Sequence, residues 1–228
     1  MIDNCVCCGS DAIAMQPVLW KELTDAWCLS SDEIAYIDRQ QGLHCTRCGT
    51  NYRSMALASA IMCSYQFVGL FEDFVRTADA QQLHVLELNE AGGLTQYLAR
   101  MPGRILGTYP DVDMMLLPYD DNSFDLVVHS DTLEHVPHPV RGLEETRRVL
   151  KEHGICAFTI PIIVGRLSRS RAGLPLIYHG NASDAASDFM VHTEFGSDAW
   201  QYAIQAGFTR CEIHALEYPT TMAFIGRV

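Results

Sequence analysis

The sequence is short of positive charge and of long apolar runs. Among 228 residues, 16 lysines and arginines stand against 28 aspartates and glutamates, a formal net charge of −12. Nucleic-acid binding relies on basic side chains that displace condensed counterions, so this balance disfavours a nucleic-acid partner. Apolar stretches such as 157–164 are much shorter than the roughly 20 residues of a membrane-spanning helix. We therefore predict no membrane span.

The amino terminus also lacks the basic start and the apolar run of a secretory signal. We therefore expect a cytoplasmic protein, whose nine cysteines are thiols or metal ligands, since thiols stay reduced in that compartment. With 48% hydrophobic and 19% charged side chains, the chain is globular. Its length predicts one full domain and a small appendage.

Two Cys-x-x-Cys-Gly units indicate a metal site near the amino terminus. Each turn lets two thiolates face one ion, and two such turns complete a tetrahedral structural zinc site. The predicted ligands are Cys5, Cys8, Cys45 and Cys48, with Cys7 and His44 as alternatives. A redox Cys-x-x-Cys requires a preceding strand, for which Cys5 leaves no room. Four thiolates leave no open coordination position, so zinc would hold residues 1–50 together as a zinc-ribbon-like module.

The rest of the chain alternates between apolar runs and helical patterns. Between Cys8 and Cys45, Ser30 and Glu33 fit a capping box at the start of a helix, and residues 51–80 suggest a helical linker. Strands are predicted at 83–88, 104–108, 124–129, 155–160, 209–216 and 221–228, with helices near 140–150 and 197–206. Such alternation predicts an α/β domain over 81–228, built on a doubly wound, mostly parallel sheet. Residues 161–193 form a long irregular stretch that suggests a binding lid.

Two segments carry a family resemblance. Residues 85–93 read Val-Leu-Glu-Leu-Asn-Glu-Ala-Gly-Gly, and residues 113–136 contain Leu-Pro-Tyr, Ser-Phe-Asp and Leu-Glu-His-Val. Together they resemble class I S-adenosylmethionine-dependent methyltransferases over roughly 83–160. The paired cysteine units and a Tyr178-His179-Gly180 loop resemble a bacterial zinc-ribbon subgroup of that family. The resemblance implies a Rossmann-like fold, S-adenosylmethionine as cofactor and methyl transfer as the activity.

The resemblance also implies a set of cofactor contacts. Glu87 would lie by the methionine end, Gly93 would give the backbone clearance and Asp113 would accept from the adenine amine. The full predicted set is Glu87, Gly92, Gly93, Tyr109, Asp111, Asp113, His129 and Ser130. The chain departs from the family in two places. Asn89 and Ala91 replace the first two glycines, and 104–113 has room for the second strand but not for a following helix and third strand. The family's ribose-binding acid falls near Tyr109, with Asp111 two residues on.

Methylation of a hydroxyl calls for a general base. Because an unperturbed histidine titrates near neutral pH, we predict His179 and His135 for this role, with His192 as a third candidate. The expected acceptor is a small molecule, such as a sugar or another hydroxylated metabolite. Two alternatives stay open: a degenerate fold that binds without catalysis, and an RNA methyltransferase. His179 could instead pack its loop, Asp113 could cap a turn, and the oligomeric state, a homodimer included, is left open.

Overall fold

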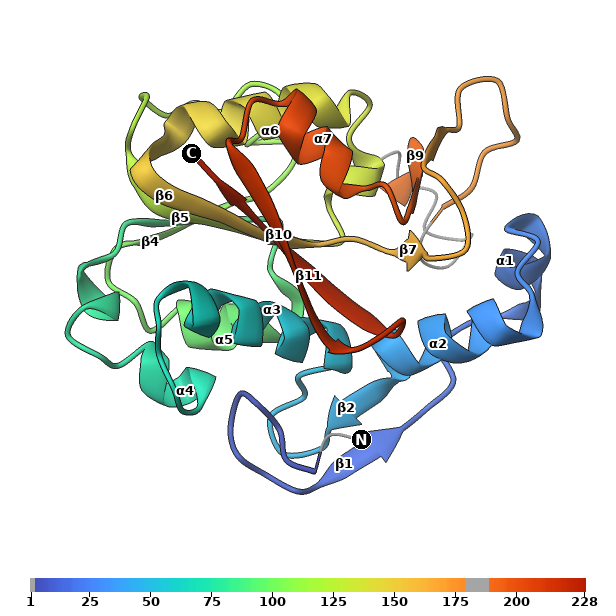
Figure 1. Ribbon diagram of the computed structural model, residues 1–228, viewed down its shortest axis with the longest axis horizontal. Helices are drawn as coiled ribbons and strands as arrows, with labels where there is room; N and C mark the ends of the chain where they lie inside the picture. Colours follow the sequence, from blue (N-terminus) through green and yellow to red (C-terminus); the bar gives the residue numbers. More distant parts are fainter. Residues whose placement is uncertain (1–2, 179–188) are drawn as a thin grey trace.

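The computed structural model describes residues 3–178 and 189–228. Its centre is a six-stranded sheet of order β10-β11-β6-β5-β3-β4 (Figure 1). The parallel strands are β3 (Val85–Leu88), β4 (Arg104–Gly107), β5 (Phe124–Ser130) and β6 (Leu150–Thr159). The antiparallel strands are β10 (Arg210–Glu217) and β11 (Thr221–Arg227). All six predicted strands are present, and the predicted doubly wound, mostly parallel sheet is confirmed.

Helices cover both faces of the sheet because successive strand residues point to opposite sides. On one face lie α6 (Pro139–Val149) and α7 (Trp200–Gln205), and on the other lie α3 (Tyr52–Ser64) and α5 (Thr95–Leu98) (Figure 1). In β5, Leu126 and Val128 join the core beneath α3, whereas Val127 joins the core beneath α6 and α7. Helix α3 and the short helix α4 (Phe71–Phe74) both lie within the predicted linker. Helix α3 packs against β11 and β6.

The amino-terminal region joins a short ribbon to two helices. Strands β1 (Ile13–Met15) and β2 (Leu43–Cys45) pair antiparallel. Residues 9–44, called the insert below, also contain α1 (Lys21–Ala26) and α2 (Ser31–Gly42). The predicted capping box begins α2: Glu33 N donates to Ser30 Oγ, and Ser30 N donates to Glu33 Oε2. Helix α2 extends from the ribbon past the edge of the main sheet (Figure 1).

The described part of the segment predicted to be irregular, 161–193, contains the short strands β7 (Ile162–Ile163) and β8 (Arg169–Ser170), and β9 (Thr193–Gly196) begins at its last residue. They form a second sheet of order β7-β9-β8. Strands of two to four residues are too short to produce a recognisable alternation. This segment packs on the insert through a separate apolar cluster of Leu23, Trp27, Ile37, Ile163, Ile177 and Val191.

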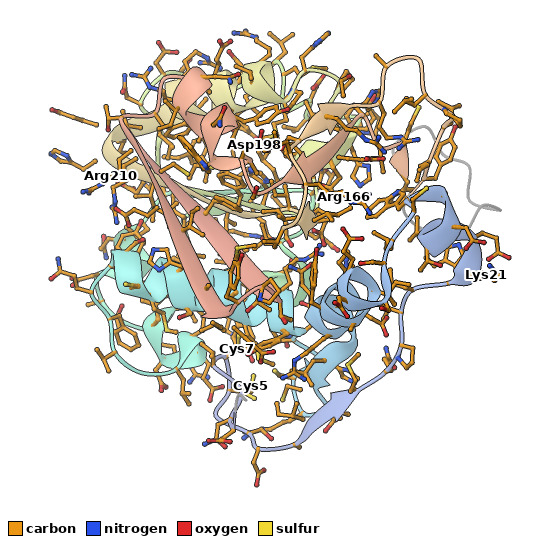
Figure 2. All side chains as sticks on the ribbon, turned by 45° about the vertical axis from the view of Figure 1, so that its right-hand side comes forward. Cys5, Cys7, Lys21, Arg166, Asp198 and Arg210 are labelled. Carbon is orange, nitrogen blue, oxygen red and sulfur yellow. The ribbon has the colours of Figure 1, made fainter. Side chains whose placement is uncertain are left out.

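Arg166 ties the same two segments together by polar contacts. Its guanidinium donates to both carboxylate oxygens of Glu33, at 2.9 and 2.8 Å, and to Trp27 O at 2.8 Å. Figure 2 shows Arg166 on the side of the body that faces α1 and α2. On the other side of the insert, Arg39 donates to both oxygens of Glu217 at 2.8 and 2.9 Å. The insert is therefore fixed to the body of the protein at two points.

The connection between β4 and β5 is short, as the sequence predicted. Residues 108–123, all of which are described, contain neither a helix nor a third strand. The described residues also form the 3₁₀ helices η1 (Ala80–Gln82), η2 (Gly92–Leu94) and η3 (Leu133–His135). Within 3–178 and 189–228, no helix is both long and apolar enough to cross a membrane.

Candidate cofactor and metal sites

The four cysteines predicted as metal ligands form one cluster, although 36 residues separate the two pairs. The sulfur atoms of Cys5, Cys8, Cys45 and Cys48 all lie within 4.8 Å of one another. Cys5 Sγ is 3.7 Å from Cys48 Sγ, and Cys8 Sγ is 3.7 Å from Cys45 Sγ. A tetrahedron with metal–sulfur bonds of about 2.3 Å has edges of about 3.8 Å. The cluster therefore fits one zinc ion.

The two turns of the cysteine cluster have the same geometry. Gly9 N donates to Cys5 O, and Gly49 N donates to Cys45 O, both at 2.8 Å. The glycines have φ of 73° and 74°, a left-handed conformation that glycine adopts without steric cost. Burial disfavours the Cys48 thiolate, yet hydrogen bonds from Thr50 and Tyr97 lower its pKa to about 6. The pKa values of the other three thiols are raised, those of Cys8 and Cys45 chiefly by burial, and a bound metal cation would favour the thiolate form.

The alternative ligands make other contacts. Cys7 O accepts from Glu72 N at 3.0 Å, and the Cys7 side chain is buried in the core beneath α3. Figure 2 shows Cys5 and Cys7 at the base of the molecule, below α3. The Nδ1 atom of His44 lies 2.8 Å from Gly42 O. Neither residue belongs to the cysteine cluster.

A cavity of about 630 Å³ opens at the carboxyl ends of the parallel strands. We call it the strand-end cavity. It is lined by residues that follow β3, β4 and β5, namely Asn89, Glu90, Thr108, Tyr109, Asp131 and Thr132, and by Asp113, Met114, Met115, His135, Val136, Pro137, Phe189, Met190 and His192. Strand β3 lies between β4 and β5, so the chain passes from β3 to β4 on one side and then crosses over to β5 on the other side. Doubly wound sheets bind their ligands at such a topological switch point.

The strand-end cavity is acidic. Glu90, Asp113 and Asp131 line it, and no lysine or arginine is among its described lining residues. Asp131 forms an ion pair with Arg53, which is almost fully buried behind it. Asp113 Oδ1 accepts from Met115 N at 2.8 Å, so this carboxylate caps a turn and lines the cavity at once. Carboxylates in a concave site attract a positively charged ligand.

The loop after β3 takes up a left-handed backbone without the family's first glycine. Asn89, Glu90 and Gly92 have φ of 54°, 48° and 56°. Asparagine enters this region more readily than most residues. The Asn89 side chain also accepts from Tyr109 N at 2.8 Å, which ties the end of β3 to the end of β4. Asn89 thus supplies the backbone conformation and adds a cross-strand link.

Glu87 lies beneath that loop, fully buried and outside the lining of the strand-end cavity. Its Oε1 accepts from Ala91 N at 2.7 Å and from Thr95 Oγ1 at 2.6 Å. Its Oε2 accepts from Arg104 Nε at 2.7 Å. Since these contacts fix both ends of the segment that carries Asn89 and Glu90, Glu87 shapes the cavity from below.

The paired glycines pack against the second cysteine turn. A Cβ atom on Gly93 would lie 2.7 Å from Thr50 Cα, and one on Gly92 would lie 2.8 Å from Ser54 Oγ. Gln96 Nε2 donates to Cys48 O at 2.8 Å. The glycine turn therefore packs on the second cysteine turn, and the close contact that its missing Cβ allows is with the protein's own backbone.

Three other predicted contacts also lie outside the cavity lining. His129 is buried and stacks on Phe158 with ring centroids 5.1 Å apart, and burial lowers its pKa to about 4. Ser130 Oγ lies 2.8 Å from Thr159 Oγ1. Asp111 is exposed on the connection after β4. Of the eight predicted cofactor contacts, the structure brings Tyr109 and Asp113 to the cavity.

His135 lines the strand-end cavity and also a second cavity, described below. Its Nδ1 is 3.0 Å from Met190 O, and because a carbonyl only accepts, Nδ1 carries a proton. Its Nε2, 3.7 Å from Glu134 Oε1, then holds either a lone pair or a second proton. His192 also lines the strand-end cavity, and burial lowers its pKa. The other predicted base, His179, lies outside the described residues.

A second cavity of about 330 Å³, which the sequence did not predict, adjoins the first. We call it the insert cavity. It is lined by Val18, Leu19, Trp20, Leu23, Trp27, Ile37, Gln41, Asp131, His135, Pro161 and Phe189. Asp131, His135 and Phe189 line both cavities. The available signal was the presence of two tryptophans in an insert between metal ligands, but only tertiary contact places them beside β5.

A doubly wound sheet with a cavity at its switch point is the architecture of Rossmann-like folds, which bind their ligands at this place. The family model described as a methyltransferase domain matches residues 48–158. Residues 48–158, just under half of the chain, therefore match a methyltransferase domain, in agreement with the resemblance.

Individual relatives match over part of their length. The chain is 36% identical over 86 residues to a demethylmenaquinone methyltransferase of Clavibacter sepedonicus, covering 36% of this chain and 35% of that protein. It is 34% identical over 73 residues to an uncharacterized methyltransferase of Mycobacteroides abscessus, covering 32% of this chain and 28% of that protein. A crystal structure of a Thermotoga maritima methyltransferase superposes with a TM-score of 0.43 at 13% identity, covering 77% of this chain and 89% of that one. The matched segments thus span about a third of the two curated relatives.

Proposed function

We propose that this protein transfers a methyl group from S-adenosylmethionine to a hydroxyl group of a small molecule. The observation that carries the proposal is the acidic strand-end cavity at the switch point of a methyltransferase domain. S-adenosylmethionine bears a sulfonium cation, so the carboxylates of Glu90, Asp113 and Asp131 suit its charge. Asp113 would bind the adenine amine, and Tyr109, at the end of β4, would flank the ribose.

His135 would act as the general base. When bound, S-adenosylmethionine would supply an electrophilic methyl group for the acceptor oxygen and would leave as the neutral thioether, with the electron pair of the broken bond on sulfur. The hydroxyl proton passes to Nε2 of His135, whose Nδ1 is held by Met190 O. Glu134 Oε1, 3.7 Å from Nε2, stabilises the resulting imidazolium, which later returns its proton to solvent.

We also infer that the cysteine cluster holds a structural zinc ion. The sulfur spacing of 3.7 Å supports this, as does the matched pair of glycine turns. Four thiolates complete the coordination of zinc, so the ion would stabilise the fold and take no part in methyl transfer. Since Gly93 and Gln96 pack on the second turn, the metal would also support the loop that borders the strand-end cavity.

The test is calorimetric titration of S-adenosylhomocysteine into purified protein of measured zinc content. We expect micromolar binding, weakened about tenfold by Asp113→Ala, since a hydrogen bond to a charged group contributes about 1.5 kcal/mol. Asp111→Ala is the matched control, because this nearby carboxylate is exposed and outside the cavity lining, and it should leave affinity within twofold. An absence of binding heat and of thermal stabilisation would instead support the non-catalytic alternative.

A further inference from the structure

We propose that the insert cavity binds the methyl acceptor and that this acceptor is a neutral aromatic molecule with one hydroxyl group. The inference rests on the proposed function and specifies its substrate class. The insert cavity measures about 330 Å³, which lies in the usual range of roughly 300–1,000 Å³ for small-molecule sites. Because it shares Asp131, His135 and Phe189 with the strand-end cavity, an occupant would meet the cofactor site beside His135.

The walls of the insert cavity are aromatic and aliphatic. Trp20, Trp27 and Phe189 present ring surfaces, and the remaining apolar wall comes from Val18, Leu19, Leu23, Ile37 and Pro161. Indole and phenyl rings interact favourably with a planar ring, either stacked or edge to face. A planar aromatic ligand therefore matches this wall better than a flexible polar one.

The polar side chains of the insert cavity are few and are grouped. Among its described lining residues they are Gln41, Asp131 and His135, and none is a lysine or an arginine. Phosphate and carboxylate ligands call for basic partners, which this lining does not offer. A sugar would press several hydroxyl groups against apolar wall, where each would lose its hydrogen bonds to water. One hydroxyl that faces His135 is the pattern that the lining accommodates.

Interactions with the rest of the protein hold these walls in place. Leu23, Trp27 and Ile37 are buried in the cluster shared with β7 and the segment before β9. Asp38 Oδ1 accepts from Val18 N at 2.6 Å and from Leu19 N at 3.0 Å. Arg53 bridges Gln40 of α2 and Asp131 at the end of β5. A preformed pocket binds a rigid ligand with little loss of conformational freedom.

The experiment measures binding of 1-naphthol, a neutral fused-ring hydroxyl compound, to the full zinc-loaded chain by ligand-observed NMR. It is run with and without saturating S-adenosylhomocysteine. Trp20→Ala should weaken naphthol binding at least fivefold and leave S-adenosylhomocysteine affinity within twofold. Trp200→Ala is the matched control, because both tryptophans are 40% exposed and Trp200 begins α7, outside the insert cavity. We expect it to change neither affinity.

A second pair of variants covers the case in which Trp20→Ala fails to fold. Val18→Glu places a charge on the cavity wall and should abolish naphthol binding, whereas Val68→Glu, at a side chain that is 96% exposed, should not. Equal naphthol binding by Trp20→Ala and Trp200→Ala would overturn the inference. So would absence of naphthol binding in protein that binds S-adenosylhomocysteine, or glucose binding that depends on Trp20. Failure of S-adenosylhomocysteine to bind would overturn the proposed function instead, because the naphthol measurement without it still tests the pocket.

Discussion

At the scale of single residues, the acidic end of β3 and the glycines after it play structural parts. Glu87 uses both carboxylate oxygens on Ala91, Thr95 and Arg104. Gly93 lies where any Cβ would meet the backbone of Thr50. The residues that border the strand-end cavity are instead Asn89 and Glu90, the two positive-φ positions of the loop. The motif thus keeps its shape while different residues line the strand-end cavity.

Gly93→Ala should therefore destabilise the protein even without cofactor. The added Cβ would lie 2.7 Å from Thr50 Cα, and relief of such a backbone clash typically costs about 1–3 kcal/mol. Urea unfolding measures the change. Gly165→Ala is the control, since its Cβ would meet nothing within 4 Å and stability should change by less than about 0.5 kcal/mol. Full stability of Gly93→Ala, combined with weaker S-adenosylhomocysteine binding, would instead favour the cofactor-clearance role implied by the resemblance.

At the scale of elements, the second cysteine turn supports the loop between β3 and α5, which borders the strand-end cavity. The turn from Cys45 to Gly49 leads directly into α3, and Thr50 packs on Gly93. Gln96 reaches Cys48 O from α5. The cysteine turns are therefore coupled through packing to the loop between β3 and α5, and we expect loss of the proposed zinc ion to affect both.

Removal of one ligand should demonstrate this coupling. Cys45→Ser should lower bound zinc from one equivalent to near zero, because three thiolates in an open site hold the ion much more weakly. It should also lower Tm by on the order of 10 °C, since structural zinc contributes directly to folding free energy. Zinc content by mass spectrometry and thermal unfolding are the measurements. Cys28→Ser, at an exposed cysteine outside the cluster, should retain zinc and Tm; equal zinc content in both variants would contradict the proposed site.

At the scale of the whole molecule, distant parts of the chain converge on the insert. Arg39 of α2 pairs with Glu217 at the end of β10, and Tyr52 of α3 donates to the same carboxylate at 3.1 Å. Arg166 closes the other side through Glu33. The insert follows the first metal turn in sequence, yet its position over the end of the sheet depends on partners near the carboxyl terminus.

This arrangement predicts a pH dependence of stability. Hydrogen bonds from Arg39, which outweigh the cost of burial, lower the pKa of Glu217 to about 2 from 4.5. A carboxyl whose pKa falls on folding stabilises the native state fully above its unfolded pKa, and this contribution is lost as pH falls from about 4.5 towards 2. Since Glu217 is partly exposed, we expect only about 1 kcal/mol.

Urea unfolding of wild type and Glu217→Gln at several pH values tests this. The difference in free energy of unfolding should be largest at pH 6 and should narrow between pH 5 and 3. Glu144→Gln is the control, because that carboxylate forms an exposed pair 3.5 Å from Arg141, and its difference should stay near zero throughout. A difference in free energy of unfolding between wild type and Glu217→Gln that does not change with pH would contradict a stabilising role for the ionised Glu217 carboxylate.

The sequence by itself determined the features that local patterns encode. The six strands, the amphipathic α6, the capping box of α2, the short connection after β4 and the paired cysteine turns all follow from spacing within a few residues. The family resemblance rests on local patterns as well, chiefly the run 113–136 and, more weakly, the acidic strand end with its glycines. These features depend on backbone periodicity and turn chemistry, which neighbouring residues set.

Only the tertiary structure decided which side chains face a ligand. Strand alternation alone does not show that His129 packs in the core or that the Glu87 carboxylate accepts hydrogen bonds from its surroundings. The partner of His129 comes from β6, and partners of Glu87 come from α5 and β4. The insert cavity exists because Trp20 and Trp27, near the start of the sequence, meet Pro161 and Phe189 from the segment between β6 and β9. Contacts between residues so far apart follow from packing and charge pairing across the whole fold, which no local pattern records.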